Sequence, residues 1–119
     1  MIANVLGTEY TITVKPYLKD EYFQKNNCDG YCDSVDHKIV ICDMKTHPLL
    51  QNESRLYCDK IQSNILRHEL IHAFFSESGL QDSAGVYTSA WTKNEELVDW
   101  IAIQFPKILK VFKKCNCVE

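Results

Sequence analysis

The sequence predicts an α+β fold, because segments with strand character fill its first part and segments with helical periodicity fill the rest. Its 119 residues fit one domain, which we place at residues 1–119. Hydrophobic residues make up 45% of the chain and charged residues 24%, as in ordinary globular proteins. This composition excludes a disordered tail, a collagen-like fibre and a low-complexity linker.

Three segments near the N-terminus are typical of strands. Residues Glu9–Lys15 alternate apolar and polar side chains, His37–Cys42 holds a run of branched apolar residues, and Gly30–Cys32 is a shorter candidate. The turn-forming residues of Asn26–Gly30 predict a loop or a hairpin connection. We expect the strands to form a small antiparallel sheet.

A long helix is expected to begin after Asn52 or Ser54, either of which can cap it, and to end near Gly79. Between these points apolar side chains recur at helical spacing: Leu56, Ile61, Ile65, Leu66, Ala73 and Phe75. This apolar face predicts packing against the sheet or against a second helix.

The second helix is expected over Asn94–Phe105, after a polar surface loop at Gln81–Ser89. Pro106 should kink or restart it, because proline has no backbone N–H to donate. Trp100 has isoleucines beside it on this helix, which favours a place in the core.

Charge and hydropathy argue against nucleic acids and membranes as partners. The formal net charge of −3 gives no general attraction to polyanions. The chain has no run of about 18 apolar residues that could span a bilayer. Its N-terminus also lacks the basic and apolar regions of a signal peptide, so we expect a cytoplasmic location.

In the cytoplasm, the six cysteines are expected to be reduced thiols. Cys42 and Cys58 suit small positions in the core. The other four could lie in loops and the tail, form pairs, or bind a second metal ion, although their C-x3-C and C-x-C spacings differ from those of zinc ribbons. These four are Cys28, Cys32, Cys115 and Cys117.

One motif carries chemistry: residues 68–72 read H-E-x-x-H within the first predicted helix. His68 and His72 are four residues apart, so they lie about 40° apart on one helix face and can bind one ion together. Glu69 is rotated by about 100° from His68, beside the ion, where its carboxylate can reach a metal-bound water. Two imidazoles and a carboxylate base are the arrangement of zinc metalloproteases. We therefore expect one Zn²⁺ per chain, a metal favoured by the ligand types.

A catalytic zinc needs a third protein ligand and an open position for water. The second helix offers Glu95, Glu96 and Asp99. Glu95 and Asp99 are four apart and share a face, so we expect Glu95 to complete the ligand set and Asp99 to accept the spare N–H of a ligand histidine. Glu96 points elsewhere and suits a surface charge near the helix N-terminus.

The motif followed by the run Asn94–Asp99 resembles the gluzincin arrangement of thermolysin-like peptidases, in which N-E-x-x-x-D follows H-E-x-x-H. The resemblance implies the same roles for Glu95 and Asp99. The small size is similar to the ImmA/IrrE-type metallopeptidases of phages and mobile elements, whose glutamate-bearing helix often ends in proline, here Pro106. The chain departs from that pattern in having Asp99 where asparagine is usual and in lacking a recognisable DNA-binding segment.

This resemblance covers roughly residues 60–107. It implies a minimal zincin-like domain, with a small N-terminal antiparallel sheet packed on the H-E-x-x-H helix and a second, C-terminal helix. Its implied partner is a peptide or protein substrate.

We expect peptide-bond hydrolysis by zinc-activated water, with Glu69 as general base. Two residues are candidates for stabilising the oxyanion: Tyr87, between the helices, and His47, before the first helix. An extended substrate could add to an edge strand of the sheet, for which His37–Cys42 is a candidate.

Two other hypotheses stay open. The same ligands could hold zinc for stability alone, in which case Glu69 would be replaceable. Alternatively, the chain could be a regulatory binding protein of phage or mobile-element type that contacts a repressor or a host protein through aromatic residues such as Trp91 and Trp100.

Overall fold

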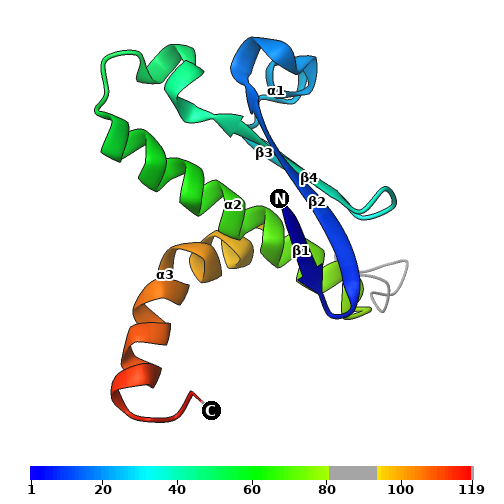
Figure 1. Ribbon diagram of the computed structural model, residues 1–119, viewed down its shortest axis with the longest axis vertical. Coiled ribbons are helices and arrows are strands. Elements are labelled where there is room, and N and C mark those ends of the chain that lie inside the picture. Colours follow the sequence, from blue (N-terminus) through cyan, green and yellow to red (C-terminus); the bar gives the residue numbers. More distant parts are fainter. Residues whose placement is uncertain (81–93, 119) are drawn as a thin grey trace.

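The computed structural model describes residues 1–80 and 94–118, and it has an α+β architecture, as predicted. Figure 1 shows helix α2 running along the sheet, with α3 packed against α2. Short 3₁₀ turns occupy residues 17–19, 44–46 and 48–50. The helices and strands of the described residues are β1 (Ile2–Val5), β2 (Thr8–Pro16), α1 (Glu21–Asn26), β3 (Gly30–Asp33), β4 (Lys38–Asp43), α2 (Arg55–Glu77) and α3 (Glu95–Lys114).

The sheet is mixed, so the predicted antiparallel sheet is wrong in one pairing. The strand order is β1-β2-β4-β3, and β2 pairs with β4 in parallel, while β1–β2 and β3–β4 are antiparallel. A parallel pair needs a crossover connection, which here consists of α1 and β3, the segments between the two strands. The sequence reading missed α1, and with it the crossover.

Strand β4 is an interior strand, so its prediction as an edge strand is also wrong. Its residues from Ile39 to Cys42 are all buried. Ile39 and Ile41 belong to the apolar cluster under α2, whereas Val40 and Cys42 pack with Phe23 of α1. A continuous apolar run of this kind is typical of a strand covered on both faces. The edge strand on this side of the sheet is β3.

Helix α2 is anchored at both ends. The Ser54 hydroxyl accepts a hydrogen bond from the backbone N–H of Tyr57 (3.2 Å) and caps its start. At its C-terminal end, Glu77 accepts hydrogen bonds from the hydroxyls of Thr8 and Tyr10, each at 2.7 Å, which attach the helix to the β1–β2 hairpin. Gly79, with a φ of +76°, takes the left-handed conformation expected just past a helix end.

Asn94 caps the start of helix α3 by accepting a hydrogen bond from the N–H of Leu97 (3.0 Å), and the helix buries Val98 and Ala102. Pro106 does not end the helix, which continues to Lys114 with an axis that changes direction along its length (Figure 1). Trp100 is 55% exposed, so its predicted place in the core is wrong: it lies on a different face from Val98 and Ala102.

A hydrogen bond between the helices compensates for Pro106. In a regular helix the carbonyl of Ala102 would accept from the N–H of residue 106, which proline lacks. Arg67 of α2 donates its Nε–H to this carbonyl instead, at 2.8 Å. The residue preceding the H-E-x-x-H motif therefore fixes α3 on α2 at the point where α3 has a free acceptor.

None of the helices in the described part of the chain is both long and apolar enough to cross a membrane.

Candidate metal centre

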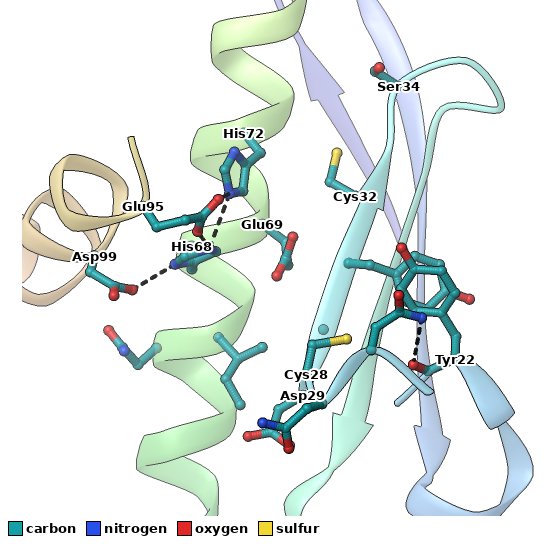
Figure 2. Close-up of a pocket in the computed structure, with 16 residues that line it drawn as sticks. Tyr22, Cys28, Asp29, Cys32, Ser34, His68, Glu69, His72, Glu95 and Asp99 are labelled. Carbon is teal, nitrogen blue, oxygen red and sulfur yellow. Dashed lines mark hydrogen bonds and ion pairs between the residues drawn. The ribbon is translucent and has the colours of Figure 1, made fainter. Parts of the chain in front are cut away.

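The motif histidines and Glu95 converge at the crossing of α2 and α3 (Figure 2). The Nε2 atoms of His68 and His72 lie 3.1 Å apart. The carboxylate of Glu95 lies 3.0 Å from Nε2 of His68 and 3.4 Å from Nε2 of His72. Ligand atoms bound at about 2.0–2.1 Å around a tetrahedral ion are separated by about 3.3 Å. The three side chains therefore have the spacing of a metal-binding triad.

Asp99 fixes the orientation of one of these histidines. Its carboxylate accepts a hydrogen bond from Nδ1 of His68 at 2.8 Å. In the neutral form of His68, a proton on Nδ1 leaves the lone pair on Nε2, the nitrogen next to His72 and Glu95. A carboxylate behind a histidine is the usual support of a histidine that ligates a metal.

Burial favours the neutral form of the second histidine. Loss of solvent around His72 lowers the pKa of its imidazole, and the neighbouring His68 acts in the same direction, while Glu95 opposes them. Only the neutral imidazole can ligate a metal ion. The donor set therefore consists of two imidazole nitrogens and one carboxylate, which fits zinc in type and number.

Glu69 is the one buried charged residue among those described, with 6% of its surface exposed. Figure 2 shows its carboxylate directed from α2 into the pocket, toward the side of β3. Loss of solvent raises the pKa of Glu69 to about 7; the charge of Glu95 adds to this rise and His68 opposes it. A carboxyl group whose pKa lies near neutrality is suited to accepting and donating a proton during a reaction.

Gly30 allows strand β3 to approach Glu69 closely. A Cβ atom at position 30 would lie 2.7 Å from Cγ2 of Ile65 and 3.1 Å from Oε1 of Glu69. Any side chain here would push the edge strand away from α2 or displace the Glu69 carboxylate. The sequence indicated a turn at Gly30 but gave no sign of this contact, because it joins residues 39 positions apart.

These groups share one pocket of about 680 Å³. Its walls are the end of α1 and the loop after it, the edge strand β3, the middle of α2 and the start of α3 (Figure 2). The pocket-lining residues that sequence reasoning missed include Tyr22, Asn64 and Ser34. Their contribution depends on long-range packing, so no local pattern could have found them.

Comparisons with protein-family models, curated proteins and solved structures gave no match. The resemblance to ImmA/IrrE-type metallopeptidases therefore stays a prediction, and the chemistry has to be argued from the geometry of the site.

Of the two candidates for oxyanion stabilisation, only His47 lies within the described residues. Tyr87 lies outside the described residues, as do Trp91 and the expected loop Gln81–Ser89. His47 is described, but it is not one of the residues lining the pocket. Its Nε2 lies 3.2 Å from the carboxylate of Asp29, which does line it. His47 is therefore linked to the pocket through Asp29, and its role in stabilising an oxyanion stays a prediction.

The cysteines give no second cluster of potential metal ligands within residues 1–80 and 94–118. Cys42 and Cys58 are buried, as predicted for core positions. Cys28 and Cys32 are half-buried at the pocket wall, while Cys115 and Cys117 are exposed after the end of α3. Helix α3 carries its last residues away from β3, which separates the two pairs (Figure 1).

Proposed function

We propose that this protein is a zinc-dependent peptidase with a zincin-like active site, in which His68, His72 and Glu95 bind the metal. The observation that carries the proposal is the convergence of these three side chains, whose ligand atoms lie within 4.8 Å of one another, next to the buried Glu69. A structural zinc site has a closed ligand set and no use for a buried carboxylate beside it. A hydrolytic site needs both an open position and a base.

The proposed reaction is hydrolysis of a peptide bond. A zinc ion in this position would activate water and polarise the carbonyl of the scissile bond. Glu69 accepts the proton of the attacking water and later donates it to the leaving amine. Asp99 holds His68 in the tautomer that ligates the metal, and Gly30 leaves the space that the carboxylate of Glu69 occupies.

The edge strand β3 supplies a binding surface for an extended substrate. One side of β3 pairs with β4, and no strand among residues 1–80 and 94–118 pairs with the other side, which lies beside the pocket. Backbone N–H and C=O groups on a free edge can pair with a peptide as an added strand. A peptide bound in this way would run past Gly30 and so past Glu69.

The test is cleavage of a fluorogenic peptide library by the zinc-loaded protein and by Glu69→Gln. We expect the variant to keep its zinc and its fold but to lose activity by about 10²–10⁴-fold, since it lacks the proton acceptor. Glu96→Gln, on the same helix as Glu95 but outside the pocket-lining residues, is the matched control and should keep full activity. Removal of zinc by a chelator should abolish cleavage, and readdition should restore it.

Equal cleavage by the wild type and Glu69→Gln would overturn the proposal. A different result would favour the alternative, a metal-stabilised regulatory binding protein: the wild type binds zinc and unfolds when zinc is removed, but it cleaves no peptide.

A further inference from the structure

A second carboxylate in the pocket, that of Asp29, has no role in the proposed metal site. Asp29 lies in the loop immediately before Gly30, so it precedes by one residue the point where β3 meets Glu69. Its backbone carbonyl accepts a hydrogen bond from the N–H of Cys42 (2.8 Å), which fixes the loop against β4. Asp29 is one of the residues that line the pocket, and its side chain is 40% exposed, so a ligand can reach it.

His47 orients this carboxylate without neutralising it. Nδ1 of His47 accepts a hydrogen bond from the backbone N–H of Leu49 (3.2 Å), so Nδ1 carries a lone pair. The ring proton therefore lies on Nε2, and this nitrogen is 3.2 Å from the Asp29 carboxylate. The ring of Tyr17 packs against the imidazole with centroids 4.7 Å apart and holds it in place. The pair as a whole keeps the negative charge of the carboxylate.

The other acidic groups of the pocket already have cationic or proton-donating partners in the proposed site. Glu95 would ligate the metal, Asp99 accepts from His68, and Glu69 exchanges a proton during the reaction. No lysine or arginine is present among the described residues that line the pocket. Asp29 therefore leaves a negative charge, positioned by His47, at the end of the pocket where β3 begins.

We propose that Asp29 is a specificity-determining residue that selects substrates with a lysine or arginine side chain near the scissile bond. This inference rests on the proposed function, since it assumes that a peptide occupies the pocket. A cationic side chain would lie against the Asp29 carboxylate while its peptide backbone pairs with β3. A glutamate side chain at the same place would meet repulsion, and a glutamine would lack the charge interaction.

Binding can be tested separately from cleavage by using the zinc-loaded Glu69→Gln variant. Matched fluorescent peptides would carry lysine, glutamine or glutamate at each position in turn. At one position we expect the lysine peptide to bind roughly fivefold more tightly than the glutamine peptide, the upper end of the range for a partly exposed ion pair. Adding Asp29→Asn should abolish this preference by lowering the affinity for the lysine peptide to that for the glutamine peptide.

A measurement without a mutation at Asp29 guards against misfolding of that variant. The ratio of lysine-peptide to glutamine-peptide affinity should fall toward one as salt is raised, since screening weakens a charge pair at a partly exposed site. The inference would be overturned by a lysine preference that survives Asp29→Asn. It would also be overturned if the protein shows no charge preference or binds none of the peptides.

The two proposals fail in different ways. Cleavage without charge preference leaves the peptidase standing and removes the role of Asp29. Selective binding of lysine peptides that the wild type never cleaves supports the role of Asp29 and contradicts the peptidase.

Discussion

The two helices that carry the residues of the proposed metal site are held in different ways. The side chains of His68 and His72 on α2 are 18% and 22% exposed, and α2 packs along the sheet through an apolar cluster that includes Ile41. Glu95 and Asp99 on α3 are 66% and 57% exposed. Helix α3 contacts α2 through Val98, Ala102 and a few polar bonds, and it has little contact with the sheet. The histidines are therefore fixed by the core, while the third ligand depends on how one helix docks on another.

The largest effect should come from the layer under α2. Ile41 is 2% exposed and lies in the apolar cluster beneath this helix. Ile41→Ala should lower the free energy of unfolding by about 2–5 kcal/mol, because it leaves a cavity in the core. Ile103→Ala on α3, at a position 49% exposed, is the control and should change the unfolding free energy by less than about 0.5 kcal/mol. Urea unfolding of the metal-free chains measures both. Equal costs for the two variants would show that the helices are held alike.

The contribution of the α3 side to metal binding is tested at Asp99. Asp99→Ala removes the acceptor of the His68 Nδ1–H and should weaken zinc binding by about 10–100-fold, the usual cost of losing such a support. Asp99→Asn keeps a side-chain oxygen and should lose less. Competition with a chromogenic chelator gives the affinities. If the two variants lose the same affinity, or neither loses any, the hydrogen bond to His68 does not support the ligand.

The docking of α3 on α2 is tested by a double-mutant cycle at Arg67 and Pro106. Arg67→Met leaves the Ala102 carbonyl without a donor, but only while residue 106 is proline. In the Pro106→Ala background, the new N–H can bond to that carbonyl within the helix. We expect a coupling energy of about 1 kcal/mol in urea unfolding, the size of a typical hydrogen bond. Additive effects would show that Arg67 does not compensate for the proline.

The smallest effect concerns acid stability at the far end of α2. Hydrogen bonds from Thr8 and then Tyr10 hold the pKa of Glu77 below its ordinary value, and the nearby His37 acts in the same direction. A lowered pKa in the folded state means that this stabilisation is present above the ordinary pKa of glutamate and is lost as the pH falls through the folded value. Glu77→Gln should therefore show a shallower loss of stability than the wild type between about pH 5 and pH 3. Parallel urea curves at each pH provide the measurement, and an unchanged acid dependence would remove Glu77 from this role.

Features set by neighbouring residues could be predicted from the sequence, whereas features set by contacts between distant segments could not. The caps of α2 at Ser54 and of α3 at Asn94, and the shared helix face of His68 and His72, follow from capping residues and from helical spacing. The approach of Glu95 to these histidines is expected from the face it shares with Asp99 and from the family resemblance, and it depends on how α3 docks on α2. The parallel β2–β4 pair does not follow from local patterns, because it depends on α1, a six-residue helix too short to give a periodic signal. The edge position of β3 likewise depends on which strands pair. The residues it brings to the pocket, Gly30 and Asp29, could therefore not be recognised before the topology was known.

The central claim is that α2 and α3 together hold one metal ion, and metal content per chain tests it most directly. The wild type and Glu95→Gln would each be loaded with excess zinc, freed of unbound metal and measured by elemental analysis against protein concentration. We predict about one zinc per wild-type chain and a marked loss in the variant, because a three-ligand site loses its only α3 ligand. Equal zinc in both proteins, or none in a folded wild type, would contradict the account.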